Sequence, residues 1–261
     1  MNWFEALLLG IIQGLTEFLP VSSSGHLEIG KVLLGLEGTD SLAFTVAVHG
    51  ATVLSTIVVF RQDLWQLLRG SMRLQWNEET RYLALLAVSM LPVLFIGIFY
   101  KDEVESFFTG RVRFVGMMLM ITALLLLFAS YAPNRGRRIG FADALLIGLA
   151  QAVAVLPGIS RSGATISTGL ILGKDRASVA RFSFLMVLVP IIGANILDLR
   201  DAAQAPAGSG VPVMALLTGF IAAFLTGWLA CRWMIRLVQH GKLQYFALYC
   251  ALIGGLALLL A

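Results

Sequence analysis

The sequence predicts an all-α polytopic membrane protein with an inverted-topology repeat, in which each half is one re-entrant helical hairpin plus three transmembrane helices. Composition is the first observation behind this prediction: 58% of the 261 residues are hydrophobic and 13% are charged, whereas about a quarter are charged in a soluble domain. The second observation is that polar residues interrupt two strongly apolar stretches. The third is that the pattern of the first half returns in the second half.

The first interrupted stretch covers residues 2–36. Its centre, residues 13–26, reads Gln-Gly-Leu-Thr-Glu-Phe-Leu-Pro-Val-Ser-Ser-Ser-Gly-His, and the apolar run that follows is short. A helix needs roughly 20 apolar residues to cross the hydrocarbon core, so we expect the two arms to form a re-entrant hairpin. Irregular backbone at membrane depth persists only where protein or a watery cavity satisfies it, and ionisable groups there mark a functional site.

Six transmembrane spans are expected, at residues 41–60, 82–100, 113–132, 180–199, 212–234 and 243–260. Between the first two, residues 61–81 mix tryptophan and leucine with charges. This mixture favours an amphipathic helix lying in the membrane interface, and a solvated loop is the alternative. The two cysteines lie in apolar runs without metal-ligand spacing, so we expect them to be packing residues.

The repeat is visible where residues 144–151, Ala-Leu-Leu-Ile-Gly-Leu-Ala-Gln, match residues 6–13, Ala-Leu-Leu-Leu-Gly-Ile-Ile-Gln. We therefore treat 1–261 as a single membrane domain with halves 1–132 and 139–261. A hairpin returns to the side it entered from, and three crossings follow it. The second half is then inverted in the membrane, and the two interrupted segments meet near the midplane. This is the architecture of many transporters, which build their sites where the two repeats meet.

Loop charges orient this arrangement. Thirteen of the nineteen lysines and arginines fall on one side: Arg61, Arg69, Arg73, Arg81, Arg135, Arg137, Arg138, Lys174, Arg176, Arg181, Arg232, Arg236 and Lys242. The positive-inside rule makes that side cytoplasmic, so both termini and the first hairpin face the exterior. The same rule accounts for the net charge of +4, and we expect no nucleic-acid partner.

The second interruption, residues 157–165, reads Pro-Gly-Ile-Ser-Arg-Ser-Gly-Ala-Thr. Ser160, Ser162 and Thr165 supply hydroxyls at the start of a predicted helix, and helix N-termini bind anions through their unpaired N–H groups. Arg161 adds a permanent charge with a planar fork that suits phosphate oxygens. The alternative is an N-cap beside an arginine that reaches to the surface.

The first interruption supplies complementary chemistry. Glu17 suits a general base or a ligand for a hard divalent cation. Ser22, Ser23 and Ser24 are candidate nucleophiles, and His26 suits proton transfer or metal binding. Together the two interruptions predict a site for a lipid phosphate or another anion, near the outer face. His49, in the span at 41–60, either lines the same cavity or packs in the core.

At these two interruptions the sequence closely resembles the undecaprenyl-diphosphate phosphatase family, the bacterial bacitracin-resistance proteins. That family carries Glu/Gln-x-x-x-Glu followed by Pro-[Val/Ile]-Ser-Ser-[Ser/Thr]-Gly-His, met here within residues 13–26. Its second signature, Pro-Gly-x-Ser-Arg-Ser-Gly-Ala-Thr, is met at residues 157–165. The resemblance implies hydrolysis of undecaprenyl diphosphate to undecaprenyl phosphate, with a divalent cation (Mg²⁺ or Ca²⁺), at the outer, periplasmic face of the bacterial inner membrane. This reaction recycles the carrier lipid of the cell wall.

By this resemblance, the expected catalytic residues are Glu17, Ser23, His26 and Arg161. The residues expected to bind substrate are Gln13, Ser22, Ser24, Gly25, Ser160, Ser162, Gly163 and Thr165. Glu17 is also the expected metal ligand. Gln13 takes the first acidic position of the family element, which weakens the case for a two-carboxylate clamp because an amide oxygen is a poorer ligand for a hard cation.

Three classes of function are considered: a lipid diphosphate phosphatase, a transporter or flippase of the polyprenyl phosphate carrier, and a protein that only binds a lipid phosphate. The fold alone does not separate them. A serine, a histidine and a carboxylate favour the enzyme, because a carrier needs no nucleophile. The nucleophile stays open between Ser23, His26 and water, and the oligomeric state stays open too, with a homodimer among the options.

Overall fold

The computed structural model describes residues 1–36, 42–73, 75–100, 103–104, 107, 112–204 and 211–260. Within these residues the regular elements are helices, with one isolated bridge between Arg137 and Lys174. The helices are α1 (Trp3–Phe18), α2 (Ser23–Leu33), α3 (Leu42–Val59), α4 (Arg61–Ser71), α5 (Glu78–Phe99), α7 (Val112–Tyr131), α8 (Phe141–Val153), α9 (Arg161–Ile171), α10 (Arg176–Met186), α11 (Leu188–Gln204), α12 (Val213–Gln239) and α13 (Gln244–Leu260). The all-helical prediction is confirmed.

Four segments of the described chain are long and apolar enough to cross a membrane: α5, α7, α12 and Arg176–Leu197, which joins α10 to most of α11. A fifth is α3 taken together with α4, two helices bent by 72° at their junction. The multi-pass prediction is confirmed. Of the six expected spans, the one at 243–260 forms an apolar helix that is shorter than the other spans.

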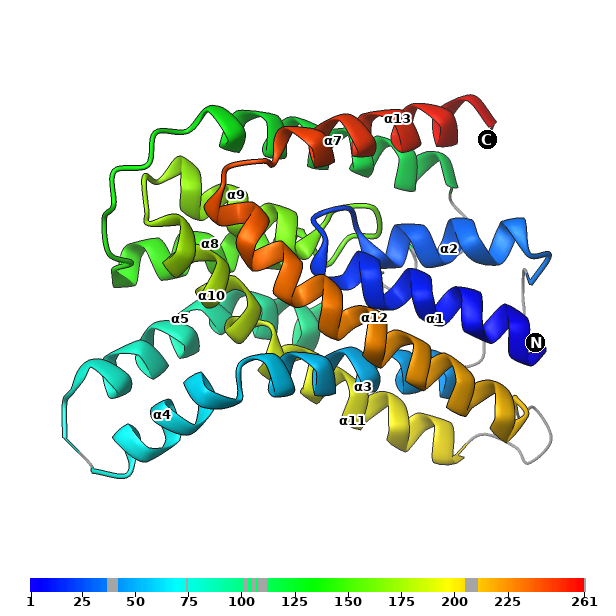
Figure 1. Ribbon diagram of the computed structural model, residues 1–261, viewed down its shortest axis with the longest axis horizontal. Helices are drawn as coiled ribbons and strands as arrows, with labels where there is room; N and C mark the ends of the chain where they lie inside the picture. The colour runs from blue at the N-terminus through cyan, green and yellow to red at the C-terminus, as the bar shows by residue number, and fades with distance from the viewer. Residues whose placement is uncertain are drawn as a thin grey trace.

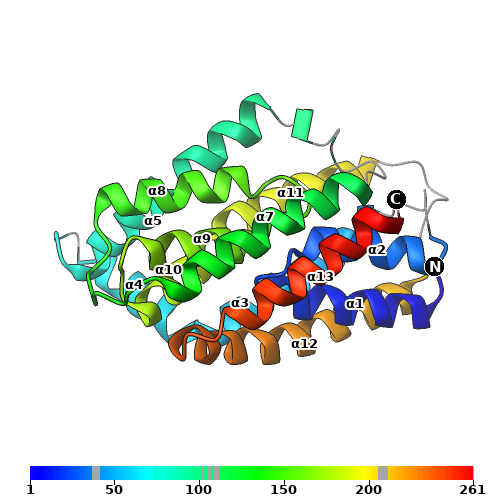
Figure 2. The same ribbon diagram turned by 90° about the horizontal axis from the view of Figure 1, so that it is seen from above.

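The two interruptions form helical hairpins. In the first, α1 turns back into α2, and in the second, α8 turns back into α9 (Figure 1). The hairpins lie in opposite halves of the molecule, and their turns face each other near its centre (Figures 1 and 2). The turns are in contact, because the Ser162 hydroxyl donates to the Leu19 carbonyl at 3.2 Å.

Helix pairing matches what an inverted repeat requires. The first hairpin packs through α1 on α12, the last-but-one helix of the second half, and α8 packs in the same way on α5 of the first half. A Cβ at Gly10 would lie 2.5 Å from the Gly219 carbonyl oxygen of α12, and at Gly148 it would meet the Ser89 carbonyl of α5. Each repeated glycine therefore allows the same close approach. The inverted repeat itself stays a prediction.

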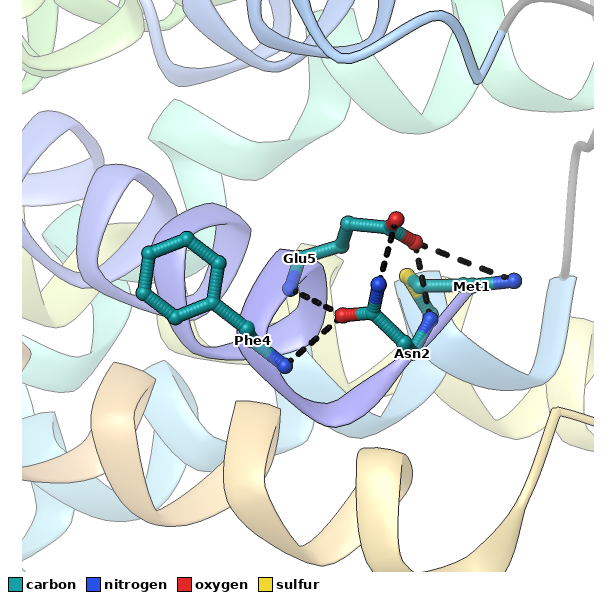
Figure 3. A network of polar contacts seen from close by, with 4 residues as sticks. All are labelled: Met1, Asn2, Phe4 and Glu5. Atoms are coloured by element: carbon teal, nitrogen blue, oxygen red, sulfur yellow. Dashed lines mark hydrogen bonds and ion pairs between the residues drawn. The ribbon is translucent and has the colours of Figure 1, made fainter.

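The first helix begins at a capping box (Figure 3). The Asn2 side-chain oxygen accepts from the backbone N–H groups of Phe4 and Glu5, both at 2.9 Å, and the Glu5 carboxylate accepts from the Asn2 backbone at 2.8 Å. Both bonds satisfy donors that a helix start leaves unpaired. They fix the end of α1 that is farther from Glu17.

Residues 61–71 form a helix, α4, as expected for the amphipathic segment. Leu67 is buried, whereas Trp65 and Leu68 are exposed. The helix is held to α10 by an ion pair of Asp63 with Arg181 at 2.7 Å. Its place in the membrane interface stays a prediction.

The turn that precedes α9 depends on Gly158. Its φ of 96° lies in the left-handed region that side chains disfavour, and an added Cβ would lie 2.5 Å from the Val115 carbonyl oxygen. We expect Gly158→Ala to destabilise the protein by about 1–3 kcal/mol, measured as a lower Tm in detergent. Gly97→Ala is the control, since nothing lies within 4 Å of its Cβ position. An equal Tm for the two variants would contradict this account.

Candidate active site

The first hairpin turns at Pro20. The residue before a proline is pushed towards extended backbone, and Leu19 has φ −70° and ψ 145° there, which ends α1 at Phe18, one residue after Glu17. Ser22 follows with φ 70°, and its hydroxyl accepts from the Gly25 N–H at 3.4 Å as the N-cap of α2. The sequence thus places a carboxylate and three serines on the two sides of one tight turn.

Glu17 and Ser23 form the central pair of this hairpin. The Ser23 hydroxyl donates to Glu17 Oε2 at 2.6 Å, and the Gln13 amide donates to the same oxygen at 3.0 Å. Gln13 is fully buried, so it holds the carboxylate in a fixed orientation towards the serine. A hydroxyl hydrogen-bonded to an oriented carboxylate is the arrangement that a nucleophile with its general base requires.

His26 points to another partner. Its Nδ1 lies 2.8 Å from the Ser22 carbonyl oxygen, and its Nε2 lies 2.8 Å from the Tyr249 hydroxyl of α13. The two rings are stacked, with centroids 5.5 Å apart. His26 lies three residues after Ser23, a spacing that can put two side chains on one face of a helix. In the structure, however, the Ser23 hydroxyl bonds Glu17, and the His26 ring bonds Tyr249 of α13.

The second hairpin brings a helix N-terminus to the same region. The Ser160 hydroxyl caps α9 by accepting from the Gly163 N–H at 3.0 Å. Thr122 of α7 braces this turn, since its hydroxyl accepts from the Ser160 N–H at 3.0 Å and donates to the Gly158 carbonyl at 3.2 Å. The Thr165 hydroxyl bonds the Arg161 carbonyl at 2.9 Å and also pairs with the Ser183 hydroxyl.

One cavity is lined by residues of both hairpins. It is lined by Glu17, Phe18, Thr52, Val53, Thr56, Arg161, Ser162, Thr165, Ser183, Phe184, Val187, Leu188 and Ile191. Glu17 of the first hairpin and Arg161 of the second therefore face the same space. Among the described residues no ion pair holds Arg161, and its charge acts on the Glu17 carboxylate across this space.

Three further predicted residues, Ser24, Gly25 and His49, are not among the residues that line this cavity. Ser24 lies 3.4 Å from Ser22, hydroxyl to hydroxyl, on the turn. Gly25 lies against α7, where an added Cβ would be 3.0 Å from Val115. His49 lies within electrostatic range of Glu17, and its carbonyl accepts from the hydroxyl of Thr52, one of the α3 residues that line the cavity.

Tyr249 and Thr122 belong to the site region but were missed by sequence reasoning. Each lies in the middle of an apolar helix, without a motif around it. For Thr122, which is buried, a threonine within a span was the one available signal, because a buried hydroxyl needs a partner. Tyr249 is partly exposed, and nothing around it in the sequence pointed to the site.

A family model described as "Bacitracin resistance protein BacA" matches residues 6–256. The chain belongs to the BacA family. Undecaprenyl-diphosphatase of Bacteroides fragilis (strain YCH46) is 54% identical over 256 residues, which cover 97% of this chain and 96% of the relative. The protein of the same name from Parabacteroides distasonis is 52% identical with the same coverage. That from Bacteroides thetaiotaomicron is 51% identical and covers 100% and 99% of the two chains.

The BacA-family resemblance implies a divalent cation, so the donors in the cavity decide whether one fits. Among the described residues no group of three or more His, Cys, Asp or Glu side chains is close enough to hold a metal ion. Glu17 is one carboxylate, and the Gln13 side-chain oxygen beside it is buried without a hydrogen-bond partner. These donors fit a cation that also takes oxygens from a bound phosphate and water, as Mg²⁺ does in phosphoryl-transfer sites.

Proposed function

We propose that this BacA-family protein hydrolyses undecaprenyl diphosphate to undecaprenyl phosphate and phosphate, which recycles the cell-wall carrier lipid and confers bacitracin resistance. One observation carries the proposal: Glu17 of the first hairpin, which accepts a hydrogen bond from Ser23, lines one cavity together with Arg161 of the second hairpin. The relatives named undecaprenyl-diphosphatase match the whole length of the chain and support the same substrate.

The reaction begins at Ser23. Its hydroxyl oxygen attacks the terminal phosphorus, and Glu17 accepts the hydroxyl proton through the 2.6 Å hydrogen bond. The bond between the terminal phosphorus and the bridging oxygen breaks, and undecaprenyl phosphate leaves with the bridging oxygen. After Glu17 has passed its proton to solvent, it accepts a proton from the water that attacks the phosphoserine. The bond between phosphorus and the Ser23 oxygen breaks, phosphate leaves, and the Ser23 oxygen takes the proton from Glu17. The competing route has Glu17 and His26 activate water, with Ser23 only hydrogen-bonding the phosphate.

Arg161 and the start of α9 bind the diphosphate in this scheme. The Arg161 guanidinium offers parallel N–H donors to phosphate oxygens, and the α9 N-terminus adds its positive dipole end. Phosphoryl transfer depends on positioning and on charge stabilisation of the equatorial oxygens. The Arg161 guanidinium, which is held on the hairpin opposite the nucleophile, supplies both.

The apolar wall of the cavity suits the lipid tail. Phe184, Val187, Leu188 and Ile191 follow one another around the junction of α10 and α11. The helix is interrupted at Val187, because Pro190 has no N–H to give to the carbonyl four residues before it. We place the first prenyl units beside this junction, with the diphosphate at the polar end.

This placement makes a prediction for Val187→Phe, which narrows the apolar end. The KM for a long prenyl diphosphate should rise about tenfold, because one misfitted apolar group costs 1–3 kcal/mol. Hydrolysis of inorganic diphosphate should change less. Val189→Phe is the matched control, since Val189 lies two residues further along, at the start of α11, and is 55% exposed. Equal KM changes for both substrates would show that the prenyl tail does not bind along this wall.

A divalent cation, Mg²⁺ or Ca²⁺, completes the proposed site. Glu17 would hold it, with the Gln13 oxygen as a weaker neighbour, and the cation would offset the charge on the diphosphate. One carboxylate gives a weak site without substrate. We therefore expect metal affinity to depend on bound diphosphate.

The active site is proposed to face the periplasm. The support is the distribution of charge. Lysine and arginine are in excess on one side, and the termini and the open end of the first hairpin lie on the other side. One chain supplies both hairpins of the site, so a homodimer is compatible with this function but is not needed for the site.

The direct test is phosphate release from undecaprenyl diphosphate by the purified protein in detergent, with and without a chelator. We expect release that stops with the chelator and returns with Mg²⁺ or Ca²⁺. A flippase of the carrier is the alternative, and it would move a polyprenyl phosphate between vesicle leaflets without releasing phosphate. Lipid movement without hydrolysis would therefore replace our proposal by the alternative.

A further inference from the structure

We propose that Tyr249 is a positioning residue for the reaction: its hydroxyl locks His26 against the Ser22 carbonyl, and this lock holds Ser23 in line with Glu17. The inference rests on the proposed function, because it assigns a role within the same site. Tyr249 lies on α13, more than two hundred residues along the chain from the hairpin it contacts.

The hydrogen bonds fix the histidine in one tautomer. A carbonyl oxygen only accepts, so His26 Nδ1 carries the proton and donates to Ser22 O at 2.8 Å. In the neutral ring Nε2 then has a free lone pair, and it accepts from the Tyr249 hydroxyl at 2.8 Å. The stacked rings leave His26 little freedom to turn. The Ser22 carbonyl thus fixes the tautomer, and the Tyr249 hydroxyl holds the ring at its other nitrogen.

The Ser22 carbonyl belongs to the strained point of the turn. Ser22 is the one non-glycine residue with positive φ in the described part of the chain. Such a conformation persists only when its surroundings hold it. The backbone N–H and the ring Nδ1 of His26 both donate to the Ser22 carbonyl, at 3.2 and 2.8 Å. The next residue is Ser23, so the strained peptide sets the direction of the nucleophile.

The neighbouring residue on α13 contacts the same turn. Cys250 is buried, and its thiol lies 3.6 Å from the Pro20 carbonyl oxygen. Two successive residues of α13 therefore hold the first hairpin at its turn. This explains how a helix far from the cavity lining could act on the reaction, through His26 and the backbone of Ser22.

Tyr249→Phe tests the inference because it keeps the stacked ring and removes only the hydroxyl. We expect kcat to fall about threefold to tenfold, the usual worth of one hydrogen bond, with KM unchanged. Tyr245→Phe is the matched control, since Tyr245 lies one turn away on α13 and is 62% exposed; it should retain wild-type kcat.

A second variant separates positioning from a general structural role. Glycine adopts the Ser22 conformation without strain, so Tyr249→Phe should matter less in a Ser22→Gly protein. There it should lower kcat by less than half the factor by which it lowers kcat in the wild-type protein. The same factor in both backgrounds, or a wild-type kcat for Tyr249→Phe, would overturn the inference. An inactive wild-type protein would instead overturn the proposed function.

Discussion

Glu17→Gln is expected to lower kcat for undecaprenyl diphosphate by about 10²–10⁴-fold, the range that a general base contributes. Glutamine has the same shape and keeps a hydrogen bond to Ser23, but it does not accept the hydroxyl proton. The side chain would also lose the negative charge that attracts a divalent cation, and this loss would lower kcat as well. The measurement is steady-state phosphate release from the purified variant with saturating Mg²⁺.

Glu28→Gln is the control for this change. Glu28 lies on α2 of the same hairpin and pairs with Lys31 at 3.1 Å, at the side of the helix rather than in the cavity. Surface ion pairs contribute little to stability, so we expect near wild-type kcat. If Glu17→Gln keeps a tenth of wild-type kcat at an unchanged Tm, Glu17 is not the general base.

Arg161→Lys is expected to lower kcat by about 10²-fold or more, as for other preorganised groups that stabilise transition-state charge. Lysine keeps the charge but loses the planar fork that binds two phosphate oxygens together. The matched control is Arg138→Lys, because the Arg138 side chain is 83% exposed and faces Glu78 at 3.4 Å, away from the cavity. Near-full activity in folded Arg161→Lys protein would contradict the proposed clamp.

The sequence was sufficient to predict the two hairpins, because the residues that form each turn are close together in the sequence. A proline stops the first arm at Pro20, hydroxyls that cap the return helix follow, and the same pattern recurs at residues 157–165. Local patterns also predicted that Glu17 and Arg161 would matter, since charges at membrane depth are costly unless they are used. Their meeting at one cavity followed from the expected inversion of the second half.

Contacts between distant segments were not predictable in the same way. Helical spacing placed His26 near Ser23, but spacing along one helix does not tell which neighbouring helix offers a better partner. The Tyr249 hydroxyl on α13 takes the histidine, and Thr122 on α7 braces the second turn. Both depend on how the long spans pack, and a single sequence carries no local signal for that.

The central claim is that Ser23, activated by Glu17, attacks the terminal phosphorus. The most direct measurement is to quench the wild-type protein in acid during turnover of terminally ³²P-labelled undecaprenyl diphosphate and to map the bound label. Phosphoserine at position 23 is the expected result, together with almost no turnover by Ser23→Ala. A Ser23→Ala variant that keeps a tenth or more of wild-type kcat, with no covalent phosphate on the wild type, would contradict the claim and leave water as the nucleophile.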